Sequence, residues 1–205
     1  MSAEGEGSRR RDPLGDMPRE ELEPAARAVA DWVTEYLHGV GSFPVLARVR
    51  PGELRAGLPP AMPEQGEPFE VLLRDFREQI LPAVTHWNHP AFFAYFSITG
   101  SAPGVLGEML AAALNVNAMV WRASPAGTEL EEHALAWLRD LLGLPPVFDG
   151  TINDTASSSS LYALAAAREA KIPESWEVGL SGAPRGRFYA SEQAHSSIDK
   201  AVITL

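Results

Sequence analysis

The sequence predicts an α/β fold. Three observations favour this class: long segments with helical periodicity, short apolar segments between them that resemble strands, and enough apolar residues for a sizeable core. Hydrophobic residues make up 45% of the 205 positions and charged residues 21%, which is typical of a globular protein. Residues 1–16 differ, because they are polar, Gly-rich and without periodicity, and they are predicted to be a disordered tail.

Residues 17–100 are predicted to form an N-terminal helical dimerisation segment. Apolar residues recur at helical spacing over residues 18–37 and again over residues 69–80. Residues 40–67 between them are rich in Pro and Gly and are expected to form an extended arm. Two helices and an arm provide too little core for an independent domain. We therefore expect this part to pack against another subunit or against the rest of the chain.

Residues 101–205 are predicted to be the first part of a larger domain. Helices are expected near residues 103–114, over residues 125–142 with Ser124 as N-cap, and over residues 155–170. A short strand is expected at residues 187–190, running into a helix that begins near Ser196. The segment His86–Phe96, HWNHPAFFAYF, has five aromatic residues and two histidines, and it is expected to be a pocket wall or a strand.

Charge and composition exclude several classes of function. The 17 Lys and Arg against 27 Asp and Glu give a net charge of −10, which argues against a nucleic-acid binder. The absence of Cys excludes disulfides, a thiolate nucleophile and Cys-ligated metals. No apolar stretch is long enough to span a membrane, and the first twenty residues are charged, so a cytoplasmic protein without a membrane anchor is expected.

A hydroxyl-rich segment, TINDTASSSS at residues 151–160, directly precedes an Ala- and Leu-rich helix. Free backbone N–H groups and the positive end of the helix dipole favour a phosphate at such a place. Thr155, Ala156 and Ser157 would make the first contacts. A Ser-rich N-cap without a ligand is the alternative. The sequence has neither a GxGxxG nor a GxxxxGK[ST] pattern, so it lacks the usual support for dinucleotide or P-loop nucleotide binding.

Histidines mark two further candidate positions. His195 lies at an expected strand-to-helix turn, where an imidazole can stack on a flat ring, act as acid or base, or simply be hydrogen-bonded. His86 and His89 have a metal-like spacing, but no Asp or Glu stands nearby to complete a site, so no metal is expected. A GxSxG elbow for Ser-His-Asp hydrolysis is absent.

Together these motifs resemble one known family. The chain is similar to the N-terminal half of the group II pyridoxal-phosphate (PLP) decarboxylases, the family of aromatic-L-amino-acid decarboxylases. Four ordered motifs carry the resemblance, which covers about residues 18–205: HWxHPxFFAYF from His86, WxASPAxTELE from Trp121, DTAS from Asp154 and QAHSS from Gln193.

The resemblance implies a fold-type I, aspartate aminotransferase-like enzyme that acts as a homodimer, with its active site at the subunit interface. Residues 101–205 would then begin the large PLP-binding domain. The reaction implied is decarboxylation of an L-amino acid, aromatic by preference, to an amine and CO₂. The resemblance assigns phosphate binding to Ala156 and Ser157, and the helix start adds Thr155 to the cofactor-binding residues. It assigns stacking on the cofactor ring, as the catalytic residue, to His195. Substrate binding is assigned to Trp87, Tyr95 and Phe96, joined by Asn117 and Met119 from the partner subunit.

Two departures from the family pattern leave alternatives open. Asn117 and Met119 stand where the aromatic-specific enzymes are expected to have Ile and Phe, so an acidic, glutamate-type substrate is one alternative. The lysine that binds the cofactor as a Schiff base is expected beyond Leu205, because neither Lys171 nor Lys200 has the expected place. A catalytically incomplete fragment that dimerises is therefore the second alternative.

Overall fold

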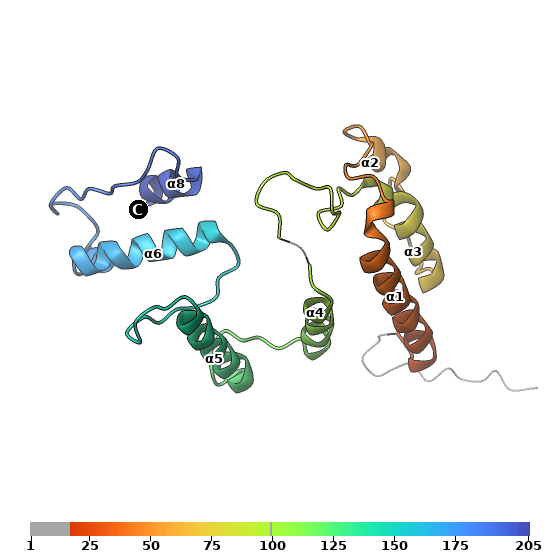
Figure 1. Cartoon of the computed structure of the whole chain (residues 1–205), viewed down its shortest axis with the longest axis horizontal. Coiled ribbons are helices and arrows are strands. Elements are labelled where there is room, and N and C mark those ends of the chain that lie inside the picture. The colour runs from red at the N-terminus through yellow and green to blue at the C-terminus, as the bar shows by residue number, and fades with distance from the viewer. Residues whose placement is uncertain (1–16, 99) are drawn as a thin grey trace, which may run out of the picture. The chain divides into compact units, whose positions relative to one another are not determined.

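The computed structural model describes residues 17–98 and 100–205, so the tail expected at residues 1–16 lies outside it. The chain divides into two compact units, Met1–Leu114 and Asn115–Leu205 (Figure 1). The boundary expected from the sequence lies at residue 100, and that division into domains stays a prediction. Every regular element in the described residues is a helix.

The first unit is built on α1, Arg19–Gly39, which confirms the helix expected over residues 18–37. Helix α1 contacts α3, Phe69–Asp75, and the Trp32 ring of α1 meets the Phe76 ring edge-on at 4.8 Å. The helical path of α3 continues without a break through a π-helical turn, Phe76–Ile80, and a 3₁₀ turn, Leu81–Ala83. The second helical segment thus ends one residue after Pro82, close to the expected end, and its winding changes from α to π to 3₁₀.

The Pro- and Gly-rich arm is more structured than expected. A 3₁₀ turn, Val40–Ser42, follows α1, and a short helix, α2 at Glu53–Gly57, lies in the middle of the arm. The reason is local: Gly52 takes a left-handed φ of 88° that turns the chain, and the Glu53 carboxylate accepts a hydrogen bond from the Arg50 amide at 2.9 Å. The expectation of a wholly extended arm was wrong at these residues.

A buried aromatic cluster joins α1 to the segment that follows α3. His86 is only 2% exposed, its Nδ1 lies 2.9 Å from the Tyr36 hydroxyl, and its ring packs on Phe43 at 4.8 Å. Burial, with a smaller contribution from the nearby charge of His89, lowers the pKa of His86 below its ordinary value of 6.5. The folded state therefore favours a neutral imidazole.

We expect this histidine to make stability fall on mild acidification. Between the lowered folded pKa of His86 and its ordinary value of 6.5, the unfolded chain binds more protons, so the stability present above pH 6.5 is lost as the pH falls through this window. For one proton, the free energy of unfolding changes by at most about 1.4 kcal/mol per pH unit. Urea unfolding of the full-length protein at pH 5.5 and 7.5 measures the difference in the free energy of unfolding. His86→Asn, whose side chain does not titrate, should reduce this difference.

Glu169 provides an internal comparison because its carboxylate responds at lower pH. Hydrogen bonds from the Ser175 hydroxyl and from the amides of Trp176 and Glu174 lower the pKa of Glu169 below 4.5, outweighing its desolvation. Its contribution is present above pH 4.5 and is lost only as the pH falls through the lowered folded value. A loss of stability confined to pH values below 4.5 would contradict the role given to His86.

The remaining helices follow the expected order. They are α4, Ala102–Leu114; α5, Pro125–Leu141; α6, Ala156–Lys171; the short α7, Ser175–Val178; and α8, Ser196–Thr204. Ser124 caps α5 by accepting a hydrogen bond from the Gly127 amide at 3.1 Å, as its sequence position predicts. Lys171 ends α6 and Lys200 lies within α8.

The two expected strands are absent from the described residues. Residues 187–190 have no regular secondary structure, so the predicted strand was wrong there. The His86–Phe96 segment consists of turns and irregular backbone, which leaves the pocket-wall interpretation. A short apolar run becomes a strand only when another strand accepts its hydrogen bonds. No helix in the described part of the chain is long and apolar enough to cross a membrane.

Candidate cofactor and substrate site

The N-terminus of α6 has free hydrogen-bond donors. Thr155 caps the helix: its Oγ1 accepts a hydrogen bond from the Ser158 amide at 3.1 Å, and its carbonyl accepts from Ser159 at 3.0 Å. Within the described residues the amides of Ala156 and Ser157 have no acceptor, as expected for the first positions of a helix. These two amides, at the positive end of a 16-residue helix, fit a phosphate group.

The chain that leads into this helix is held in place by α5. One carboxylate oxygen of Glu131 accepts hydrogen bonds from the Thr151 hydroxyl at 3.0 Å and from the Ile152 amide at 2.7 Å. The Asn153 side chain donates to the Ser159 hydroxyl at 3.1 Å. No role for Glu131 was expected, because nothing in the sequence indicates its contact with Thr151, 20 residues away. Glu131 fixes the approach to Thr155.

His195 caps α8 and leaves its ring exposed. Its Nδ1 accepts a hydrogen bond from the Ser197 amide at 3.2 Å and lies 3.0 Å from the Ser197 hydroxyl. These contacts fix the plane of the imidazole at its edge and leave its faces open. An imidazole held in this way can stack on a flat ring.

The second unit brings the two candidate cofactor elements together. Helices α6 and α8 pack side by side, and an Arg168 guanidinium N–H donates to the Leu205 carbonyl at 2.8 Å near their C-terminal ends. Figure 1 shows that both helices run in the same direction, so their N-termini lie at the same end of the pair. The candidate phosphate-binding start of α6 and His195, the N-cap of α8, therefore lie at the same end of this helix pair.

The candidate substrate residues of the first unit form a cluster of rings. Trp87 stacks on Tyr95 with centroids 5.8 Å apart and planes 8° apart, and it packs on the buried Phe92 at 4.9 Å. Tyr95 and Phe96 are almost fully exposed. Tyr95 also has a left-handed φ of 56°, a conformation that costs a bulky residue about 1–2 kcal/mol. A strained backbone and exposed rings are features of binding sites.

Asn117 and Met119 belong to the second unit. The Asn117 side-chain oxygen accepts a hydrogen bond from the Met119 amide at 2.8 Å, which forms an Asx turn, and Met119 is largely exposed. The structure thus places Thr155, Ala156, Ser157 and His195 together in one unit with these two residues, and the Trp87–Phe96 rings in the other.

The two histidines with metal-like spacing are used in other ways. His86 is hydrogen-bonded to Tyr36, while His89 Nδ1 accepts from the Ala91 amide at 2.9 Å and its Nε2 lies 3.2 Å from the Gly41 carbonyl oxygen. Across residues 17–98 and 100–205 the side chains form no group of three His, Cys, Asp or Glu suited to a metal ion.

Comparison with known proteins decides the family. Residues 51–205 match the family described as pyridoxal-dependent decarboxylase conserved domain. The chain belongs to this family. Its cofactor is pyridoxal 5′-phosphate, and the free amides at the start of α6 fit the phosphate of this group.

Two relatives of this chain are plant proteins. It is 40% identical over 194 residues to tyrosine decarboxylase 2 of Narcissus pseudonarcissus, covering 92% of the chain and 38% of the relative. It is also 40% identical over 194 residues to phenylacetaldehyde synthase of Arabidopsis thaliana, covering 92% of the chain and 39% of the relative.

A solved structure confirms the fold class. The crystal structure of Oryza sativa TDC with PLP and tryptamine aligns with a TM-score of 0.83 and 35% identity, over 94% of this chain and 42% of that protein. Fold-type I architecture is therefore confirmed for this chain. The chain spans about two fifths of the length of the relatives it matches.

Proposed function

We propose that the full-length protein is a PLP-dependent decarboxylase that converts an aromatic L-amino acid to its amine and CO₂. The observation that carries the proposal is the placement of the α6 N-terminus and His195 at the same end of one helix pair. The amides of Ala156 and Ser157 would bind the phosphate, with Thr155 fixing the turn, and the His195 ring would hold the ring plane. The bound cofactor withdraws electrons as the substrate carboxylate leaves.

Aromatic side chains support the substrate class. The rings of Trp87 and Tyr95 are parallel, and Phe96, next to Tyr95 in the chain, is also exposed. In the proposed enzyme these rings bind the substrate side chain, and Asn117 and Met119 enter the same pocket from a partner subunit. A solved relative at 35% identity contains tryptamine, and another relative is named a tyrosine decarboxylase.

The test is product formation by the purified full-length protein. With PLP, L-tryptophan, L-tyrosine or L-phenylalanine should release CO₂ and an equal amount of amine, and the protein should show visible absorption from bound cofactor. An aldehyde in place of the amine would assign the chemistry for which the Arabidopsis thaliana relative is named. Bound cofactor without CO₂ release, or no bound cofactor, would favour a catalytically incomplete dimerising protein.

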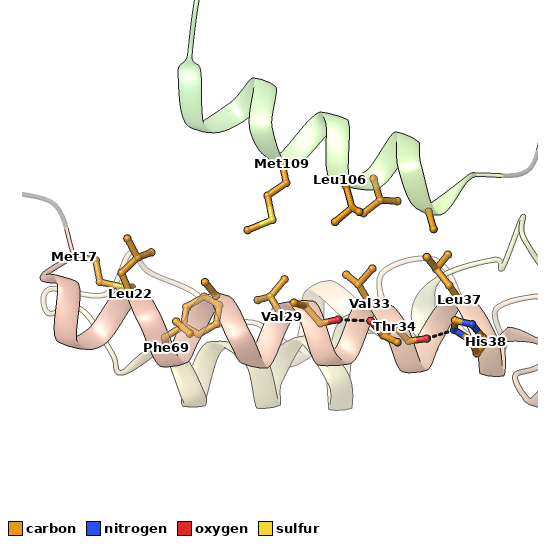
Figure 2. A pocket seen from close by; sticks show the side chains of 15 residues that line it. Met17, Leu22, Val29, Val33, Thr34, Leu37, His38, Phe69, Leu106 and Met109 are labelled. Atoms are coloured by element: carbon orange, nitrogen blue, oxygen red, sulfur yellow. Dashed lines mark hydrogen bonds between the residues drawn. The ribbon is translucent and has the colours of Figure 1, made fainter.

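The first unit supports a homodimer. Helix α4 has the sequence APGVLGEMLAAAL with one charged residue, yet its side chains are almost all exposed in the single chain. A helix that is apolar all round is normally buried. Figure 2 shows Leu106 and Met109 of α4 pointing across a groove toward Val29 and Val33 of α1. The groove has a volume of about 480 Å³ and apolar walls, and in the proposed homodimer the second copy covers this face.

A charge placed in the groove should disrupt the dimer. Met109→Glu would carry a carboxylate into an apolar interface, where its burial costs several kcal/mol, so the variant should be largely monomeric at micromolar concentration. Light scattering coupled to gel filtration measures the mass. Glu108→Gln on the same helix is the matched control and should stay dimeric. Deletion of residues 1–85 should give a monomeric or poorly soluble product, and a soluble, folded dimer from that deletion would contradict the proposed interface.

A further inference from the structure

The proposed reaction assigns no part to the most deeply buried large side chain in the described residues. This side chain is His86, at 2% exposure. Its Nδ1 and the Tyr36 hydroxyl are 2.9 Å apart and share a hydrogen bond, in which the hydroxyl is the donor when the ring proton is on Nε2. The His86 amide also donates to the Val45 carbonyl at 3.0 Å. Side chain and backbone of this residue are therefore both fixed by α1 and the chain that follows it.

His86 directly precedes the ring cluster of the proposed substrate site. Trp87, the next residue, is the ring against which both Tyr95 and Phe92 pack. The return of the loop is fixed at the same place, because the Asn88 side-chain oxygen accepts a hydrogen bond from the Gly100 amide at 2.8 Å. Tyr95 and Phe96 are themselves almost fully exposed. The orientation of these rings thus depends on how the chain is held at His86.

We propose that Tyr36 is a positioning residue for aromatic substrates: its hydroxyl, by bonding His86 Nδ1, fixes the place of Trp87 and of the Tyr95 ring stacked on it. This inference rests on the proposed function, which takes Trp87 and Tyr95 as substrate-binding residues. The helix that contributes to the dimer groove thereby also contributes to substrate affinity.

The hydroxyl can be removed without removing the ring. Tyr36 is packed on Trp32 with centroids 5.1 Å apart and on Phe43 at 5.7 Å, and Phe in its place keeps both contacts. Loss of the Tyr36 hydroxyl leaves the buried Nδ1 of His86 without its hydrogen-bond partner, so the imidazole must reorient. The reorientation acts on Trp87, while the phosphate-binding residues belong to the other unit and keep their own contacts.

Tyr36→Phe in the full-length PLP-bound enzyme tests the proposal. We expect the KM for the best aromatic substrate to rise about tenfold, with kcat and the PLP dissociation constant within twofold of wild type. The dissociation constant of indole-3-propionate, an aromatic acid without the reactive amino group, should rise by a similar factor. Tyr162→Phe removes a hydroxyl from a tyrosine of α6 that is 56% exposed, and this matched control should leave all four values unchanged.

Variants of His86 distinguish positioning from stability alone. His86→Asn keeps an acceptor close to the place of Nδ1 and should hold KM within about threefold of wild type, whereas His86→Leu should behave like Tyr36→Phe. If Tyr36→Phe does not fold, this pair decides by the same measurements. A lowered melting temperature with unchanged KM and unchanged indole-3-propionate affinity would overturn the proposal, as would equal KM values for His86→Asn and His86→Leu.

Failure of the proposed function can be distinguished from failure of the inference about Tyr36. A wild-type enzyme that releases no CO₂ from aromatic amino acids refutes the proposed function, and the indole-3-propionate measurement then still decides the role of Tyr36. Equal affinity of wild type and Tyr36→Phe for this probe, or no binding by wild type, would overturn the inference. Weaker binding by the variant would support it.

Discussion

The best substrate among L-tryptophan, L-tyrosine and L-phenylalanine is expected to exceed L-glutamate at least about a hundredfold in kcat/KM, which is about 3 kcal/mol. The pocket proposed from Trp87, Tyr95 and Phe96 offers flat apolar walls to a ring, and burial of that ring contributes a few kcal/mol at about 25 cal/mol per Å². Asn117 adds a group that can hydrogen-bond a ring hydroxyl or an indole N–H.

Glutamate would lose hydration in the same pocket without gaining a cation. Residues 84–104, which contain the three rings, include neither Arg nor Lys. An unpaired carboxylate removed from water costs several kcal/mol. Release of CO₂ from each amino acid, measured side by side, checks the ratio. Phe96→Ala should narrow it by lowering kcat/KM for the aromatic substrates alone. A clear preference for glutamate would overturn the aromatic assignment and leave the cofactor assignment intact.

Replacement of His195 by Ala is expected to lower turnover at least about a hundredfold and PLP affinity about tenfold in the full-length enzyme. The affinity loss follows from stacking, since an aromatic contact contributes about 0.5–1.5 kcal/mol. The turnover loss follows from the misplaced ring and from any proton transfer at the imidazole, a contribution of about 10²–10⁴ in rate. Equilibrium titration with PLP and steady-state kinetics measure the two effects.

An aromatic replacement separates the two roles of this histidine. His195→Phe keeps a flat face and should retain most of the PLP affinity while turnover stays low. Full turnover in His195→Phe would exclude a chemical role for the ring nitrogens. Normal PLP binding by His195→Ala would exclude stacking. Ser197→Ala, which removes the hydroxyl beside His195 Nδ1 but keeps the amide that bonds it, should have a smaller effect than either change.

The helices were predictable because their signals are local. Apolar spacing in α1, the Ser124 cap of α5 and the hydroxyl cap of α6 each act within about one to three turns of chain. The motifs that carry the family resemblance are likewise short and ordered. Sequence therefore indicated the family, the cofactor and the candidate phosphate-binding residues without any knowledge of tertiary contacts.

The strand expected at residues 187–190 shows where local signals end. A strand needs hydrogen bonds from a neighbour, and a pattern of apolar residues does not identify that neighbour. The α2 helix was missed for a related reason, since Pro and Gly indicate a break in regular structure but do not exclude one short turn between two breaks.

By itself, the sequence determined the longer helices, the family and the cofactor of this protein, because each of these is recorded in residues that are neighbours along the chain. Tertiary structure alone decided which distant residues meet. Tyr36 and His86 are 50 positions apart, and Glu131 and Thr151 are 20 positions apart. Such pairs depend on how the helices pack and on which buried polar atoms must find partners. The periodicity of residues along the sequence shows neither the packing nor these partners.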